Sequence, residues 1–122
     1  MRGWLTRDSA PESPNTDWSI PRLTSLTSSG PGLALMTESI GLAVASETPV
    51  TILNVMRGGP STGIPTKSEQ SDLNIALFGL HGDAPHLVLA PLDIADCVYT
   101  SAWAVELTQG LQTAAIVLSD QF

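Results

Sequence analysis

One arginine stands where a predicted strand gives way to a glycine-rich loop, and its side chain has the chemistry to bind a carboxylate. Arg57 closely follows the apolar run Val50–Val55, and residues 57–66 contain three glycines and two prolines, which exclude a regular element. A strand end holds the backbone of such a residue in place, and a guanidinium can bind a carboxylate through two parallel hydrogen bonds. We therefore predict that Arg57 binds an anionic substrate; the alternative is a surface arginine on a long loop.

A second candidate is a turn ahead of a predicted helix, formed by Ser28, Ser29, Gly30, Pro31 and Gly32. Glycines let a ligand approach the backbone closely, and a proline suits the first turn of a helix. The free N–H groups and the positive end of the helix dipole favour an anion at this place. The turn can hold an anion or press against a planar ring, or it can be an ordinary tight connection. It is no P-loop, because no Gly-Lys-Ser/Thr sequence follows it.

The other residues that could do chemistry form weaker patterns. His81, Asp83 and His86 lie close together in the sequence, but their spacing matches no zinc signature, and we predict no metal site. His81 is better suited to a polar contact at the rim of a site. Cys97 falls among apolar residues of a predicted helix, which indicates a packed side chain rather than a nucleophile. No Gly-x-Ser-x-Gly sequence supports a serine hydrolase, and we assign no catalytic residue.

The hydrophobic pattern after residue 22 predicts strands and helices in alternation. The expected strands are short and mostly apolar, and the expected helices carry apolar residues at helical spacing. The strands are Leu23–Ser28, Val50–Val55, Leu87–Leu89 and Thr113–Leu118, and the helices are Leu33–Glu47, a segment from Thr66 or Ser68 to about Phe78, and Ile94–Gln109. This order predicts an α/β fold with a parallel sheet and helices on both faces, in which ligands bind beyond the carboxyl ends of the strands.

Residue types at the expected helix ends support these boundaries. Pro49 is expected to end the first helix, and Thr66 with Glu69 three residues later forms a candidate capping box for the second. Asp93 is expected to cap the third helix and Gly110 to stop it. Both candidate loops then leave the sheet at the same edge.

The composition of the chain limits its class and its partners. Of its 122 residues, 43% are hydrophobic and only 14% are charged, and the net charge is −7. So little charge leaves apolar and hydroxyl groups at the surface, and we expect a partner to cover part of it. Five basic residues are too few for a nucleic-acid surface, and no apolar run approaches the roughly 20 residues that cross a bilayer. A single cysteine fits a reducing compartment, and we predict a cytoplasmic protein.

Two parts of the chain differ in composition. Residues 1–22 contain three prolines and no periodic apolar pattern, which predicts an irregular or disordered lead-in. The alternative is a segment that docks through Trp4 and Trp18. Residues 23–122 carry the alternating pattern, and we expect them to form one α/β domain.

Residues 26–122 resemble the α subunit of 2-oxoacid:ferredoxin oxidoreductases, and the 2-oxoglutarate type best. The resemblance is carried by the runs Thr-Ser-Ser-Gly-Pro-Gly from Thr27, Met-Thr-Glu from Met36, Arg-Gly-Gly-Pro-Ser-Thr-Gly-Ile-Pro-Thr-Lys from Arg57, Glu-Gln-Ser-Asp-Leu from Glu69, His-Gly-Asp-Ala-Pro from His81 and Leu-Ser-Asp-Gln from Leu118. The run from Arg57 is the specific one, because related thiamine enzymes share the Ser-Gly-Pro-Gly turn. The resemblance implies a thiamine-diphosphate-binding fold of the pyrimidine type.

The resemblance also implies an activity and a partner. In the family, a 2-oxoacid is oxidatively decarboxylated to an acyl-coenzyme A, and the electrons pass to ferredoxin; 2-oxoglutarate is the substrate expected here. Thiamine diphosphate lies between this domain and a β subunit, and that partner carries Mg2+ and an iron–sulfur cluster. By the same resemblance, Arg57 matches the arginine that binds the substrate carboxylate. The turn from Ser28 to Gly32 matches the loop that lines the aminopyrimidine pocket.

One part of the family pattern has no counterpart in this sequence. The family has a glutamate upstream of the turn that bonds the aminopyrimidine, but Glu12 stands in an Ala-Pro-Glu-Ser-Pro context that does not match. We therefore expect an N-terminally truncated, incomplete pyrimidine-binding domain that is inactive alone. The alternatives are a non-catalytic remnant or subunit-interaction module, a small α/β module for another phosphorylated ligand, and a thiamine-dependent decarboxylase or synthase.

Overall fold

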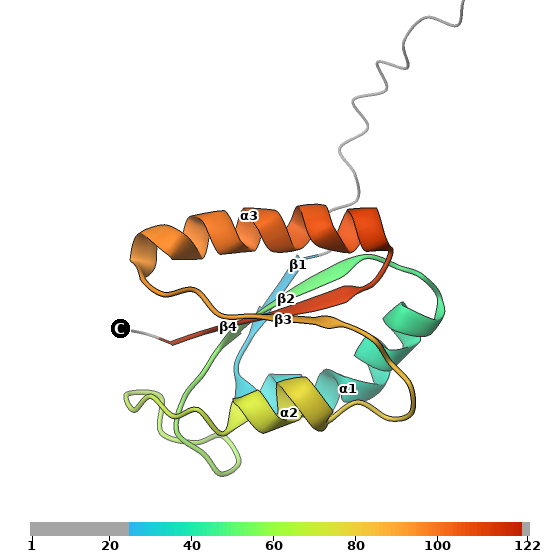
Figure 1. The fold of residues 1–122 in the computed structure, drawn as a ribbon. Helices are drawn as coiled ribbons and strands as arrows, with labels where there is room; N and C mark the ends of the chain where they lie inside the picture. Colours follow the sequence, from blue (N-terminus) through green and yellow to red (C-terminus); the bar gives the residue numbers. More distant parts are fainter. Residues whose placement is uncertain (1–24, 121–122) are drawn as a thin grey trace, which may run out of the picture.

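Four parallel strands form one sheet in the computed structural model, which describes residues 25–120 (Figure 1). The elements follow the predicted alternation: β1 (Ser25–Ser28), α1 (Gly30–Ala45), β2 (Val50–Val55), α2 (Asp72–Phe78), β3 (Leu87–Leu89), α3 (Ile94–Leu111) and β4 (Ala114–Ser119). The strands lie in the order β1-β2-β4-β3, and every neighbouring pair is parallel. The predicted parallel sheet is confirmed.

The two central strands, β2 and β4, are the most deeply buried part of the sheet. β4 is buried from Ala114 to Leu118, without the alternation expected of a strand with one solvated face. It pairs with β2 along its whole length, from Val50↔Ala114 to Val55↔Ser119. β1, at one edge, is largely exposed. The central pair therefore provides the base from which the loop after β2 leaves the sheet.

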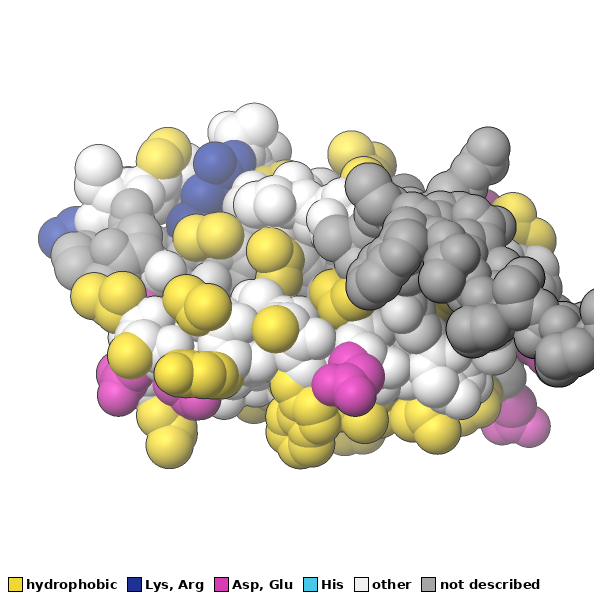
Figure 2. All heavy atoms as spheres, turned by 90° about the horizontal axis from the view of Figure 1, so that it is seen from above, with side chains coloured by type: hydrophobic (Ala, Val, Ile, Leu, Met, Phe, Trp, Pro, Cys, Tyr) yellow, Lys and Arg dark blue, Asp and Glu magenta, His cyan; other side chains and the backbone are white. Residues whose placement is uncertain are grey.

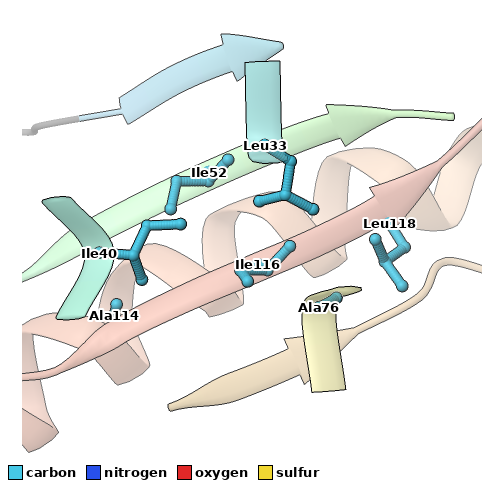
Figure 3. Packing of buried hydrophobic residues seen from close by; sticks show 7 residues of the cluster. All are labelled: Leu33, Ile40, Ile52, Ala76, Ala114, Ile116 and Leu118. Atoms are coloured by element: carbon cyan, nitrogen blue, oxygen red, sulfur yellow. The ribbon is translucent and has the colours of Figure 1, made fainter. Parts of the chain in front are cut away.

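Helices cover both faces of the sheet, as predicted (Figure 1). α1 and α2 lie on one face, and α3 lies alone on the other. The core under α1 and α2 consists of Leu33, Ile40, Ile52, Ala76, Ala114, Ile116 and Leu118 (Figure 3). Under α3, Ala104 packs against Ala115 and Val117. Each large aliphatic side chain fully buried in such a layer stabilises the fold by roughly 1.5–3 kcal/mol.

The ends of α1 differ from the prediction at both sides. The helix begins at Gly30 rather than Leu33, with Pro31 in its first turn, where the missing proline N–H is not needed. It ends at Ala45, because Glu47 adopts a left-handed conformation, with φ 53°, and the Glu47 and Thr48 N–H groups donate to the Val44 and Ala43 carbonyls, at 3.2 and 2.8 Å. The chain thus leaves the helix well before Pro49, and the prediction that the proline ends the helix is wrong.

α3 has the predicted start and a different end. The Asp93 carboxylate accepts a hydrogen bond from the Asp96 N–H at 2.8 Å, which confirms the predicted cap. Gly110 was expected to stop the helix, but α3 continues to Leu111. The left-handed residue at the end is Gln112, with φ 52°. Its N–H donates to the Thr108 carbonyl, so the chain closes the last turn with a non-glycine residue.

α2 starts later than predicted. It begins at Asp72, and the expected capping box of Thr66 and Glu69 does not form. The Glu69 carboxylate instead accepts a hydrogen bond from the Gly59 N–H at 2.6 Å. The Gly58 N–H donates to the Lys67 carbonyl at 2.6 Å, so residues 58–67 close on themselves. The loop therefore includes Thr66 and Lys67, which lie at the predicted start of the helix.

The predictions for residues 1–22, including docking through the tryptophans, lie outside the described residues, as does the start of the predicted strand Leu23–Ser28. The predicted division of the chain at residue 22 therefore stays a prediction. Within residues 25–120, no helix combines the length and the apolar character needed to span a bilayer.

The outward face of α3 is apolar. Ile94, Val98, Tyr99 and Trp103 are all more than half exposed there. Figure 2 views the molecule from the α3 side and shows hydrophobic side chains gathered on this face. The only charged residues in the helix are Asp96 and Glu106. We call the four exposed hydrophobic residues the α3 surface.

Candidate functional site

A cavity of about 540 Å3 lies at the carboxyl edge of the sheet, between the start of α1, the loop after β2 and the start of α2. Its lining includes Gly30, Pro31, Leu35, Arg57, Gly59, Asp72 and Ile75. We call it the Arg57 cavity. It lies where parallel α/β sheets place their ligands, beyond the carboxyl ends of the strands.

Strand pairing brings the two predicted motifs to this cavity. Ser28, the last residue of β1, pairs with Asn54 near the end of β2, so the segments that follow leave the sheet side by side. Gly30 and Pro31 of the turn and Arg57 of the loop line the same space. Two segments that are distant in the sequence therefore form one candidate site.

The five residues of the predicted turn divide into two groups. Gly30 and Pro31 line the cavity, whereas Ser28, Ser29 and Gly32 are not among its lining residues. The Ser28 hydroxyl lies so close to Gly32 that a Cβ atom there would overlap it. Ser29 precedes α1 in extended backbone, and its side chain makes no capping hydrogen bond. These three residues thus shape the turn that carries the two cavity residues.

The loop after β2 is closed by its own hydrogen bonds. The Ile64 N–H donates to the Gly58 carbonyl at 2.8 Å, and the Gly63 N–H donates to the Pro60 carbonyl at 3.1 Å. Gly63 has a positive φ of 69°, and a Cβ atom there would overlap the Gly58 carbonyl. A glycine is therefore required at this position. The closed loop holds Arg57 and Gly58 at the end of the sheet.

The Arg57 side chain is half-buried, and its Nε atom is buried. Among the described residues, this Nε has no hydrogen-bond partner. A buried guanidinium N–H without a partner costs free energy, and the side chain that carries it lines the cavity, where a carboxylate can pair with the guanidinium. The geometry therefore suits Arg57 to an anionic ligand in the cavity.

Asp72 is a cavity residue that the pattern analysis did not single out. Its side chain is 5% exposed, and its Oδ2 atom accepts a hydrogen bond from the Asn54 amide at 2.9 Å. Asn54 itself is fully buried at the end of β2. The sequence feature that could have indicated Asp72 is the Gln-Ser-Asp run, which is part of the family resemblance but has no role assigned to it. An acidic residue at the start of a short helix is otherwise typical of the surface.

The chemistry of the lining fits one side of a composite site. Leu35 and Ile75 offer apolar surface to a ring, and Gly30 and Pro31 let a ligand approach the backbone. Arg57 is the only basic side chain among the lining residues that the structure describes. A single guanidinium matches one carboxylate, whereas a diphosphate would need further cations or metal ions.

The structure does not bring the two histidines to the Arg57 cavity. His81 lines a separate hollow beside α1, together with Glu38 and Leu42. Both ring nitrogens of His86 lie within hydrogen-bond distance of backbone carbonyls, Ala84 at 2.7 Å and Ala76 at 2.6 Å. Across residues 25–120, no group of three or more metal-ligating side chains occurs. The part-buried Cys97 lies at another cavity, of about 460 Å3, beyond β3 and β4.

Comparison with known proteins gives a consistent match. Residues 22–122 match the family model described as pyruvate flavodoxin/ferredoxin oxidoreductase, thiamine diphosphate-binding. The 2-oxoglutarate oxidoreductase subunit KorA of Mycobacterium tuberculosis is 49% identical over 94 residues, which cover 77% of this chain and 14% of that protein. The 2-oxoglutarate synthase subunit KorA of Archaeoglobus fulgidus is 50% identical over 93 residues, covering 76% of this chain and 27% of that protein.

A solved structure gives the same result at the level of the fold. The 2-oxoglutarate:ferredoxin oxidoreductase from Magnetococcus marinus, with 2-oxoglutarate, coenzyme A and succinyl-CoA bound, matches with a TM-score of 0.76 and 51% identity. The match covers 79% of this chain and 17% of that one. This chain thus spans roughly a seventh to a quarter of the length of these relatives. The chain belongs to the thiamine-diphosphate-binding domain family of the pyruvate flavodoxin/ferredoxin oxidoreductases, with the α subunits of 2-oxoacid:ferredoxin oxidoreductases as its relatives.

Proposed function

We propose that this chain forms one side of the substrate and cofactor site of an oxidoreductase that decarboxylates a 2-oxoacid, most simply 2-oxoglutarate. The products are an acyl-coenzyme A and electrons for ferredoxin. The observation that carries the proposal is the meeting of Arg57 with the Gly30-Pro31 turn at one cavity. The names of the relatives support the reaction and the substrate class.

In this proposal Arg57 binds the carboxylate of the 2-oxoacid. Its guanidinium can donate two parallel hydrogen bonds to the carboxylate, and the closed loop from Gly58 to Lys67 keeps its backbone from moving. The half-buried position strengthens the interaction, since less water competes for the guanidinium. Arg57 thereby orients the substrate carbonyl toward the reacting atom of the cofactor.

Thiamine diphosphate, when bound, supplies the electron sink that decarboxylation of a 2-oxoacid requires. Gly30 and Pro31 would hold its aminopyrimidine side, because they bring the backbone to the cavity wall without bulky side chains. Leu35 and Ile75 would cover the ring and exclude water. In the proposal the diphosphate, Mg2+ and the iron–sulfur cluster belong to a β subunit, since Arg57 is the only basic residue that residues 25–120 contribute to the lining.

The proposed β subunit covers the open side of the Arg57 cavity. Ser61 and Thr62 at the mouth are exposed in this chain. Enclosure by a second subunit would bury the site and complete its ligands, as expected for a cofactor held between two domains. We place the assembled enzyme in the cytoplasm, where ferredoxin and coenzyme A would be its soluble partners.

Calorimetric titration of thiamine diphosphate with Mg2+ into this chain, with and without a cognate β subunit, tests the proposal. Binding only in the presence of the β subunit is the expected result. The Arg57→Ala variant in the same complex should still bind the cofactor and lose affinity for the 2-oxoacid. Absence of binding under both conditions would contradict the proposal and favour a non-catalytic interaction module.

A further inference from the structure

A buried carboxylate stands at the Arg57 cavity and has no assigned role. Asp72, the first residue of α2, is 5% exposed. Aspartate is seldom buried unless its charge is compensated, because removing a carboxylate from water is costly. Its burial at the wall of a candidate site therefore needs a reason.

The surroundings of Asp72 supply two compensating interactions. Its Oδ2 atom accepts a hydrogen bond from the Asn54 amide of β2, at 2.9 Å. Its carboxylate also lies against Gly30, so closely that a Cβ atom at Gly30 would overlap it. Gly30 is the first residue of α1, and the positive end of a helix dipole stabilises a nearby carboxylate. One side chain thus connects β2, α1 and α2.

The space beside Gly30 is filled by this carboxylate, which explains why a glycine stands there. Any side chain at position 30 would move either Asp72 or the start of α1. Gly30 and Asp72 both line the cavity, so the spacing between their helices sets its width on this side. Figure 1 shows α1 and α2 together on the same face of the sheet.

The loop that carries Arg57 is tied to the same segment. The Gly59 N–H donates to the Glu69 carboxylate at 2.6 Å, and Glu69 lies just ahead of α2. A shift of Asp72 would therefore move the anchor of the Arg57 loop as well as the wall formed by Gly30. Glu69 is exposed and the bond from Gly59 is at the surface, so Asp72 is the buried end of this connection.

We propose that Asp72 is a positioning residue for the Arg57 cavity: its buried carboxylate, oriented by Asn54, holds the start of α1 and the loop after β2 at the spacing that the ligand needs. It acts through Gly30 and Glu69 rather than by binding the substrate. The inference rests on the proposed function only for the kinetic part of its test.

Hydrogen exchange of the full chain, read by mass spectrometry, tests the positioning without any substrate. Asp72→Asn keeps the side-chain shape and removes the charge beside Gly30 at the start of α1. The amides of Leu33, Gly59 and Ile64 should then exchange roughly 10- to 100-fold faster, as expected when one charge-assisted contact of a local structure is lost. The amides of β4, from Ala114 to Leu118, should be unchanged. The matched control is Asp83→Asn, an exposed aspartate in a loop away from the cavity.

Two results of that measurement would overturn the inference. One is unchanged exchange at all these amides, which would mean that the carboxylate holds nothing in place. The other is faster exchange to the same extent in β4, which would mean a general contribution to stability rather than a local one. Asn54→Ser, which removes the orienting amide but keeps a small polar group, should reproduce the local effect in weaker form.

In the assembled enzyme, Asp72→Asn should raise the KM for the 2-oxoacid about tenfold and leave kcat within about twofold, because binding geometry changes while the chemistry does not. A loss of about tenfold in kcat with an unchanged KM would contradict a positioning role. The exchange experiment needs no turnover, so its result stands even where the wild-type complex fails to use any 2-oxoacid. In that case the proposed function is wrong and the structural role of Asp72 remains.

Discussion

At the residue scale, Arg57 combines a backbone held by a closed loop with a buried Nε atom that has no partner within residues 25–120. The loop after β2 is closed by hydrogen bonds at both of its ends, and the buried Nε atom has no acceptor among the described residues. A carboxylate bound in the cavity that Arg57 lines would pair with this guanidinium. This makes Arg57 the residue whose removal should affect substrate binding most.

Arg57→Ala in the assembled enzyme should lower kcat/KM for the 2-oxoacid. The expected loss of transition-state stabilisation is roughly 2–4 kcal/mol, the scale for losing one partner of a buried charged contact. Arg57→Lys keeps the charge but cannot form the paired hydrogen bonds, and an intermediate loss is expected. Steady-state kinetics with varied 2-oxoacid measures both. Lys67→Ala, at an exposed basic residue of the same loop, is the control and should change little. Equal kinetics for Arg57→Ala and the control would exclude the assignment.

Gly30 and Gly41 form a matched pair within α1. A methyl group at Gly30 would collide with the Asp72 carboxylate, whereas nothing lies within 4 Å of a Cβ at Gly41. Gly30→Ala should therefore destabilise the fold by about 1–3 kcal/mol through overpacking. Gly41→Ala should stabilise it by up to about 1 kcal/mol, because alanine is the better helix former. Urea unfolding of both variants measures this, and a similar response of the two glycines would contradict the packing at Gly30.

At the scale of elements, α3 has the most complete capping. The Asp93 carboxylate accepts from the Asp96 N–H, and the Asp96 carboxylate accepts from the Leu92 N–H at 2.9 Å. Two N–H groups are thus satisfied by carboxylates, one in the first turn of the helix and one just ahead of the cap residue. The pair orients the helix that covers one whole face of the sheet.

Asp93→Ala should lower the free energy of unfolding by about 1 kcal/mol, the usual value of an N-terminal cap. Thermal unfolding followed by circular dichroism is a suitable measurement. Asp83→Ala removes the same charge from an exposed loop and should have almost no effect. An equal loss in both variants would show that net charge, rather than capping, is responsible.

A substitution at the end of α3 should stabilise the fold rather than destabilise it. Gln112 adopts a left-handed conformation with φ 52°, which costs a residue with a Cβ roughly 1 kcal/mol. Gln112→Gly should therefore raise the free energy of unfolding by up to about 1 kcal/mol, reduced by the loss of its side-chain hydrogen bond to the Gln109 carbonyl. Chemical denaturation would detect the gain. Destabilisation would show that this side-chain bond outweighs the backbone strain.

At the scale of the whole molecule, an apolar outer surface accompanies a low charge content. The α3 surface, formed by Ile94, Val98, Tyr99 and Trp103, is exposed in the isolated chain. A contiguous apolar surface of this kind favours association. The net charge of −7 opposes it only in part, because charges are few on this face.

The double variant Val98→Ser/Trp103→Ser should reduce self-association of the chain, as measured by sedimentation velocity at increasing concentration. Its free energy of unfolding should fall by only about 1–2 kcal/mol, since Val98 is exposed and Trp103 is partly buried at 56% exposure. Leu42→Ser, at an exposed leucine of α1 on the opposite side of the sheet, is the control. Self-association that is unaffected by the double variant would mean that the α3 surface does not mediate it.

Sequence reasoning was accurate where the determining interactions are local. The alternation of elements follows from apolar runs and helical spacing, and the Asp93 cap forms with a residue three positions away. It failed at Gly110, where a favourable residue type was available but the helix continued to Leu111 and Gln112 took the left-handed conformation. It also failed at Glu69, whose carboxylate bonds to Gly59 instead of completing a capping box. At Glu69, a contact with a residue ten positions away overrode the local preference.

The sequence by itself determined the order of the elements, the parallel α/β class, the family and the two motifs that line the cavity. Only the tertiary structure decided that Gly30 and Pro31, but not Ser28, Ser29 and Gly32, line it. It alone also revealed the burial of Asp72 against Asn54, a residue 18 positions away, and against Gly30. The physical reason is that strand pairing and helix packing set which distant residues meet, and no local pattern records the space left between them.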